Sequence, residues 1–160
     1  MTSTPSDSTA TTAEAITFVD TNVLIYAYNA ADPAKQRAAQ AALVSLWDAR
    51  IGAVSTQILQ EFYSVATTKL RPAMSHGEAR EVVSLYTAWP VVLIEPSLIL
   101  TASRLVERHK LSFWDALMVE AARTAGASRL LTEDLNHGQV IEGVRIESPF
   151  RPDWPPEPVG

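Results

Sequence analysis

The chain has 160 residues, of which 47% are hydrophobic and 19% charged, and its formal net charge is −5. That length predicts a single domain that buries about two thirds of the surface of its unfolded chain. The absence of cysteine excludes disulfides, thiolate zinc sites and cysteine nucleophiles, and the acidic balance argues against a nucleic-acid coat protein or a membrane-surface protein.

The two ends of the chain differ in composition from the part between them. Residues 1–14 are mostly Ser, Thr and Ala and contain no Lys or Arg. They match neither a signal peptide nor a transit peptide, so we expect a disordered tail. Residues 149–160 are rich in proline, and we expect a tail or a strap over the surface there. The folded domain is predicted to span residues 15–148, without a membrane span and in the reducing cytoplasm.

The first folded stretch joins a strand directly to a helix. Residues 16–19 are β-branched or aromatic and predict a buried strand, and apolar residues with helical spacing begin at Val23. Asp20, Thr21 and Asn22 lie between the two. This order places the acid at the carboxyl edge of a sheet, where ligands bind in open α/β folds. Taken alone, Asp20 is better explained as the N-cap of the helix.

Strands and helices alternate through the rest of the chain. Further strands are predicted at 53–54, 91–94, 129–131 and 144–146, and further helices at 33–50, 55–70, 76–89, from 96 onward and at 113–124. Residues 91–94 are continuously apolar, which favours a strand covered on both faces. The helix at 113–124 is apolar nearly all round and should be the most buried. This alternation predicts an α/β fold with a mostly parallel sheet and helices on both faces.

Three further acids are candidates for a site beside Asp20. Asp115 begins the most apolar helix, although Ser112-x-x-Asp115 also resembles a capping box. Asp134 follows a strand, where it could equally serve a turn, and the adjacent Glu133 could take its place. Glu61 lies at the border of an apolar helix stripe, and by itself is better explained as a surface residue.

Together these acids indicate a cation site. An α/β sheet brings Asp20, Asp115 and Asp134 to one rim. Carboxylates a few ångströms apart repel one another, so such a cluster takes up protons or binds cations. Oxygen ligands without cysteine select Mg²⁺ or Mn²⁺ rather than zinc. The three histidines have no paired metal-ligand spacing and are predicted to be surface residues.

Four short stretches resemble the motifs of the PIN-domain family, and more narrowly those of the VapC-like ribonuclease toxins of type II toxin–antitoxin systems. They are residues 19–24 (VDTNVL), 60–62 (QEF), 111–116 (LSFWDA) and 131–135 (LTEDL), in the order of that family. The resemblance implies a PIN-like α/β/α sandwich and a Mg²⁺- or Mn²⁺-dependent endoribonuclease with one or two ions. It implies metal-binding, catalytic roles for Asp20, Glu61, Asp115 and Asp134, supported by Asn22 and Thr132. It also implies a homodimer and a cognate antitoxin.

Other interpretations stay open at this point. An RNA-binding rim is predicted at Arg104, Arg108 and Lys110, although an ordinary solvated helix face explains them better. A stand-alone RNA-processing nuclease would share the same motifs. A haloacid-dehalogenase-like phosphatase would need a second Asp at the position of Asn22. A non-catalytic PIN-like adaptor would have lost some acids, and a receiver-like domain would need its Asp after a mid-chain strand.

Overall fold

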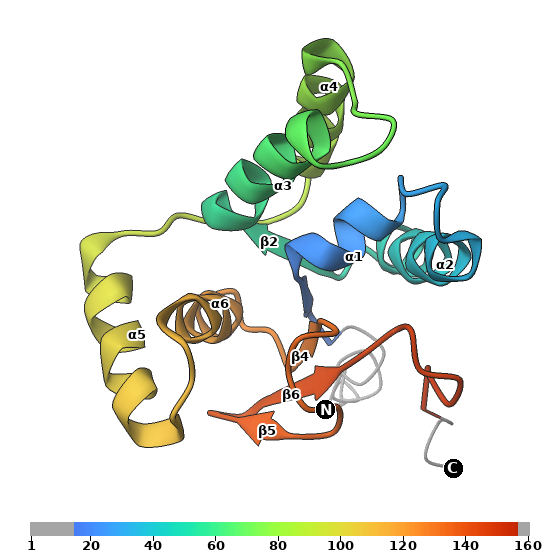
Figure 1. Ribbon diagram of the computed structural model, residues 1–160. Helices are drawn as coiled ribbons and strands as arrows, with labels where there is room; N and C mark the ends of the chain where they lie inside the picture. The colour runs from blue at the N-terminus through green and yellow to red at the C-terminus, as the bar shows by residue number, and fades with distance from the viewer. Residues whose placement is uncertain (1–14, 157–160) are drawn as a thin grey trace, which may run out of the picture.

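The centre of the fold is a six-stranded sheet (Figure 1). The computed structural model describes residues 15–156, so the predicted tail at 1–14 and residues 157–160 lie outside the described residues. The strands are β1 (Thr17–Val19), β2 (Gly52–Ser55), β3 (Val91–Val92), β4 (Arg129–Leu131), β5 (Val140–Ile141) and β6 (Val144–Glu147). They lie in the order β3-β2-β1-β4-β6-β5, and β5 is antiparallel to β6 while the other pairs are parallel. This confirms the predicted fold class.

Within residues 15–156, six helices surround the sheet. They are α1 (Thr21–Tyr26), α2 (Pro33–Ala49), α3 (Thr56–Thr68), α4 (His76–Tyr86), α5 (Pro96–His109) and α6 (Phe113–Thr124). Figure 1 shows α6 on one side of the sheet and α2 on the other, with α5 outside α6 and α3 paired with α4. Among the described residues, no helix is long and apolar enough to cross a membrane.

The strand order reverses direction at β1. The chain moves from β1 through β2 to β3 on one side, then returns to place β4, β6 and β5 on the other. In open α/β sheets a crevice opens where the order reverses, outside the carboxyl ends of the strands, and ligands bind there. The carboxyl ends of β1 and β4 are level, because Val19 pairs with Leu131. Asp20 and Thr132, which follow these two residues, therefore lie side by side at the edge.

Two predictions about strands need correction. Residues 91–94 were expected to be covered on both faces, but β3 has two half-buried residues and Leu93 is 61% exposed. Its position at the edge of the sheet leaves one side without a partner strand, so its apolar composition does not report burial on two faces. The short antiparallel strand β5 was not predicted, since two residues are too few for a detectable alternation.

The core packs both faces of the sheet, and α6 contributes more buried residues to it than any other helix in the described part of the chain. Six of the twelve residues of α6 are buried, among them Leu117, Met118 and Val119. Gly126, with φ +75°, follows the helix, as the sequence predicted for its C-terminal end. The predicted burial of this helix is confirmed. This burial fixes the position of α6, whose amino end lies at the same edge as the carboxyl ends of the strands.

A cluster of aromatic rings covers the start of β2. The rings of Trp47, Tyr86 and Trp89 lie with centroids 4.9–5.4 Å apart. A Cβ atom at Gly52 would lie 2.5 Å from the ring of Trp89, which is itself buried. Only glycine therefore fits at this position without moving the cluster.

We predict that Gly52→Ala lowers the free energy of unfolding by about 1–3 kcal/mol, because the methyl group overpacks a rigid indole. Chemical denaturation measures the change. Gly77→Ala is the matched control: its Cβ would meet only the Ser75 hydroxyl at 3.9 Å, so it should be neutral or stabilise α4 by up to about 1 kcal/mol. Equal stabilities for the two variants would contradict the packing at Gly52.

Candidate functional site

The four predicted acids line one pocket. A cavity of about 160 Å³ is lined by Asp20, Gln57, Ile58, Glu61, Trp114, Asp115, Met118 and Asp134. A neighbouring cavity of about 370 Å³ shares three of these acids and is lined by Asp20, Thr21, Asn22, Ile25, Tyr26, Asn29, Glu61, Val65, Glu133 and Asp134. Side chains that are far apart in the sequence therefore converge at the carboxyl edge of the sheet.

The secondary structure explains this convergence. Asp20 directly follows β1, and Asp134 comes three residues after the end of β4, which is paired with β1. β2 is parallel to β1 on its other side, so α3 also begins at this edge and places Glu61 in its second turn. The chain then leaves α6 at its far end to enter β4, and Asp115 in the first turn of α6 is thereby kept at the near edge.

Asp20 is the centre of a hydrogen-bond network. Its Oδ1 accepts from the backbone N–H of Thr21 at 2.6 Å. Its Oδ2 accepts from the Thr132 hydroxyl at 2.8 Å and from the Asn22 amide at 3.1 Å. Asp20 is also the N-cap of α1, so the capping role and the clustering role both hold for this side chain.

Asn22 joins two of the acids. Its Nδ2 donates to Asp20 and to Asp134, in both cases over 3.1 Å. The backbone N–H of Asp134 also donates to the hydroxyl of Thr132 at 3.1 Å. Asn22 and Thr132 thus hold Asp20 and Asp134 close together while offsetting part of their repulsion.

Glu133 lies apart from this network. Lys35 binds its carboxylate at 2.8 Å and also donates to the hydroxyl of Tyr26 at 3.3 Å. Asp134, in contrast, contacts Asn22 and lines both acidic cavities. The geometry therefore favours Asp134 over Glu133 as the fourth acid.

The remaining two acids also combine local and clustered roles. Glu61 accepts from the Thr21 hydroxyl at 2.8 Å and from the Gln57 amide at 3.0 Å. Ser112 caps α6 by accepting from the backbone N–H of Asp115 at 3.1 Å, as the capping-box reading predicted. The carboxylate of Asp115 nevertheless lines the pocket.

Burial and like charges oppose ionisation in this pocket. Burial raises the pKa of Asp20 from 3.8 to about 7, with a contribution from the charges of Asp134 and Glu61, although hydrogen bonds from Thr132 and Thr21 act in the opposite direction. Partial burial also raises the pKa of Asp134; the Asn22 amide opposes this, while Glu133 and Asp115 add to it. A cation in the pocket would favour the ionised forms of both carboxylates and so oppose these upward shifts in pKa.

The donor set fits a hard divalent cation. Among residues 15–156, no three His, Asp or Glu side chains stand in a ready-made metal-binding group, so the acids share the pocket without closing on one point. All four offer carboxylate oxygens, the ligands that Mg²⁺ and Mn²⁺ prefer. Within the described residues, Asn22 Oδ1 and Gln57 Oε1 are buried acceptors that lack a hydrogen-bond partner. A site with this surplus of acceptors suits a cation and its waters.

The three predicted basic residues are not among those that line the acidic cavities. Arg104, Arg108 and Lys110 belong to the end of α5, where Arg108 pairs with Glu142 beside β5 and β6. Among the described residues that line the two acidic cavities, none is basic. The three histidines are likewise absent from both linings, and each has a hydrogen-bond partner elsewhere: His76 with Tyr63, His109 with Glu142 and His137 with Ser148.

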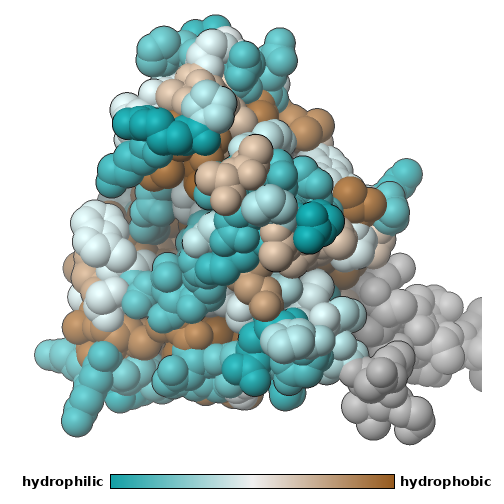
Figure 2. Space-filling model, turned by 45° about the vertical axis from the view of Figure 1, so that its right-hand side comes forward, coloured by the Kyte–Doolittle hydropathy of each residue, from teal (hydrophilic) through white to brown (hydrophobic). Residues whose placement is uncertain are grey.

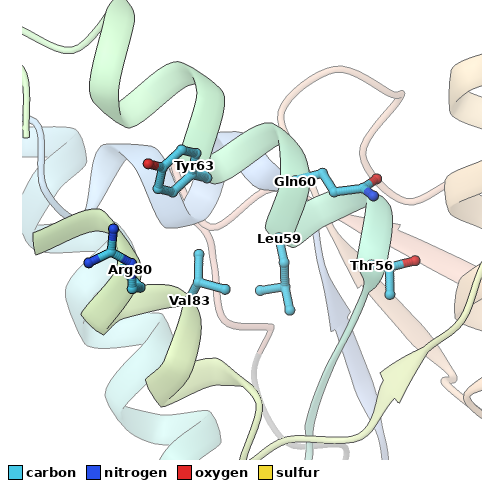
Figure 3. Close-up of a pocket in the computed structure, with 6 residues that line it drawn as sticks. All are labelled: Thr56, Leu59, Gln60, Tyr63, Arg80 and Val83. Carbon is cyan, nitrogen blue, oxygen red and sulfur yellow. The ribbon is translucent and has the colours of Figure 1, made fainter. Parts of the chain in front are cut away.

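A larger and more apolar hollow lies on another side of α3. Figure 3 shows Leu59 and Tyr63 of α3 facing Val83 and Arg80 of α4 across a cavity of about 450 Å³. No carboxylate lines it, so it offers none of the chemistry of the acidic pocket. Over the face shown in Figure 2, hydrophilic side chains predominate and hydrophobic ones form smaller patches.

Sequence reasoning did not assign a site role to Thr21, Gln57 or Trp114, which line the two cavities. Thr21 and Gln57 both donate to Glu61, and the spacing of Gln57 and Glu61, one helical turn apart, was the available signal. Trp114 lines the pocket beside Asp115, but an aromatic residue at the start of an apolar helix is indistinguishable from a core residue by sequence pattern.

Comparisons with known proteins support the fold. A family model described as the PIN domain matches residues 17–142. No curated protein matches the sequence. The fold is similar to that of VapC20 from Mycobacterium tuberculosis, described as a toxin that cleaves the sarcin–ricin loop, with 24% identity, a TM-score of 0.56 and coverage of 71% of this chain and 86% of that one.

Two toxin–antitoxin structures are also similar in fold. A toxin–antitoxin complex from Klebsiella pneumoniae has 21% identity and a TM-score of 0.60, over 80% of this chain and 94% of the other. The DNA-bound VapBC of Salmonella typhimurium has 16% identity and a TM-score of 0.58, over 84% of this chain and 98% of the other.

The raised pKa of Asp20 predicts a pH-dependent stability in metal-free buffer. The folded state binds this proton more tightly than the unfolded chain, so the stabilisation is complete below about pH 4 and is lost as the pH rises through about 7. Each pKa unit corresponds to about 1.4 kcal/mol, so wild type should lose on the order of 2–4 kcal/mol relative to Asp20→Asn across this range. Denaturation with EDTA present measures this difference, and parallel pH profiles would contradict it.

Proposed function

This chain belongs to the PIN-domain family and has the fold of the VapC toxins, and we propose that its acidic pocket is the active site of a divalent-metal-dependent endoribonuclease. The observation that carries the proposal is the convergence of Asp20, Glu61, Asp115 and Asp134 on one cavity at the point where the strand order reverses.

In this mechanism, Asp20, Glu61, Asp115 and Asp134 would hold one or two Mg²⁺ or Mn²⁺ ions. The chemistry supplied there would be Lewis acidity, which would lower the pKa of a water molecule and neutralise charge on the scissile phosphate. Thr132 and Asn22 keep the carboxylate of Asp20 oriented toward the pocket from one side, through their hydrogen bonds to Oδ2. Thr21 and Gln57 do the same for Glu61. No protein base is required, which agrees with the absence of histidine from the lining residues that the structure describes.

The geometry weighs against two of the rival functions. A dehalogenase-like phosphatase needs a second acid two positions after the first, and that position is Asn22, whose amide joins Asp20 to Asp134. A non-catalytic adaptor does not need a pocket in which like charges are kept together at a cost in stability.

We extend the proposal to a toxin of a toxin–antitoxin pair. The similar structures include toxin–antitoxin complexes, and VapC20 is described as cleaving an RNA loop. The partner proposed for this chain is a cognate antitoxin that blocks the acidic pocket, and the toxin is proposed to act in the cytoplasm as a homodimer. A neighbouring gene for a small protein that binds the purified chain and stops RNA cleavage would support this role. A solitary RNA-processing nuclease would have no such neighbour.

We predict that the purified chain cleaves RNA only with Mg²⁺ or Mn²⁺, and that Asp20→Asn lowers the rate by about 100-fold or more, because the site loses a charge that holds the cation. Gel analysis of end-labelled RNA with metal or EDTA measures both effects. Thermal denaturation is the control: Mg²⁺ should raise the melting temperature of wild type more than that of the variant. Cleavage by Asp20→Asn at the wild-type rate would refute the assignment.

A matched pair of variants separates the adjacent acids. Asp134→Asn should lower cleavage by about 100-fold, since its carboxylate lines both cavities. Glu133→Gln removes one partner of a partly exposed ion pair with Lys35 and should stay within about fivefold of wild type. Initial rates under the same metal concentration measure both, and the reverse order of effects would make Glu133 the fourth acid.

A further inference from the structure

Trp114 places a large apolar surface in water beside the acidic pocket. Its side chain is the most exposed of the large hydrophobic residues in the part of the chain that the structure describes, with 64% accessible. It also lines the same cavity as Asp20, Glu61 and Asp115. Burying an indole stabilises a folded protein. An indole that stays in water at this place therefore points to a role in binding rather than in the packing of the core.

The fold itself does not need this side chain. Ser112 caps α6 and the buried face of the helix is supplied by residues from Ala116 onward. The indole touches one described aromatic ring, that of Phe113, in an edge contact with centroids 5.6 Å apart. The other three tryptophans lie in packed surroundings: Trp47 and Trp89 in the aromatic cluster, and Trp154 in a hydrogen bond to the buried Glu147.

The negative charge of the pocket gives RNA no basic side chain to bind, and an indole can contribute affinity without charge. Four carboxylates face the cavity, and the described lining residues include no basic side chain. Lys35 is paired with Glu133, which lines the larger cavity. The whole chain has a net charge of −5. Contacts of Lys and Arg with phosphate are the usual source of affinity for nucleic acids, so another interaction has to contribute here. Stacking of a base on an aromatic ring does so without any charge.

We propose that Trp114 is a stacking platform for an unpaired base next to the phosphate that is cleaved. This inference rests on the proposed function, and it adds a residue that binds the substrate together with the part of the substrate that it contacts, an unpaired base. Bases inside a duplex are already stacked and cannot reach the indole, whereas a splayed base in a loop can. Because every base has a flat face, the platform selects unpaired structure more than sequence.

Trp114→Ala, compared with wild type, tests the platform on a short, unstructured, end-labelled RNA oligonucleotide. Fluorescence anisotropy gives the dissociation constant, and both proteins carry Asp20→Asn in this measurement so that the RNA stays intact. Cleavage by the proteins that retain Asp20 gives kcat and KM. Trp114→Ala should weaken binding and raise KM by about tenfold, with a smaller effect on kcat. Trp114→Phe should restore most of the affinity, because phenylalanine keeps a stacking face. Leu100→Ala, which removes an equally exposed apolar side chain from α5, is the control and should change neither value.

An abasic nucleotide isolates the contact itself. An abasic nucleotide in place of one base beside the cleavage site should weaken binding to wild type but not to Trp114→Ala. Such non-additive losses of affinity would show that the base and the indole contact each other. Equal losses with both proteins, or an affinity that Trp114→Ala leaves unchanged, would overturn the inference. If Asp20→Asn abolishes cleavage while Trp114→Ala behaves as wild type, the nuclease assignment is supported and the stacking role of Trp114 is refuted. Binding that depends on Trp114 and on the base, in a chain that cleaves no RNA, would keep the platform and refute the nuclease.

Discussion

The main constraint on this structure is that it keeps several carboxylates together in a pocket that is partly removed from water. Burial and like charge raise the pKa of Asp20 to about 7 and raise that of Asp134, which is unfavourable for a protein that has no other use for these groups. The fold offsets part of this cost with donors from Asn22, Thr132 and the Thr21 backbone. The remaining imbalance is what a cation would neutralise, so the arrangement is suited to binding one.

The acids also belong to the local framework of the chain. Asp20 is the N-cap of α1, and Asp115 lies in the capped first turn of α6. Both acids are therefore positioned by short stretches of backbone whose geometry is set by capping. The larger elements then bring these stretches together: the register of β1 with β4 aligns Asp20 with Thr132, and the apolar packing of α6 holds Asp115 against the sheet. The proposed chemistry and the capping of the helices therefore involve the same side chains.

The site is asymmetric in a way that suits a nucleic-acid substrate. Carboxylates, the Gln57 amide and the exposed indole of Trp114 line the same cavity. Lys35 is held by Glu133 and Tyr26, and the basic end of α5 lies elsewhere, where Arg108 pairs with Glu142. Phosphate and base would consequently be held by different means, the first through a cation and the second through an apolar face. This division explains how an acidic protein of the PIN-domain family could bind RNA.

The sequence alone determined the order and kind of most elements, because periodic apolar residues, caps and prolines act over a few residues. It also determined which acids were candidates, since Asp20 and Asp134 follow strands and Asp115 starts an apolar helix. It could not show that residues 91–94 form a half-exposed edge strand, because an edge position depends on which strands pair. Only the tertiary structure decided that Glu133 turns to Lys35 while Asp134 turns to Asn22, that Gln57 and Thr21 hold Glu61, and that Trp114 stays in water. The contact of Gln57 with Glu61 is local, since the two residues lie one helical turn apart. The other outcomes depend on contacts between segments far apart in the chain, and no local pattern encodes them.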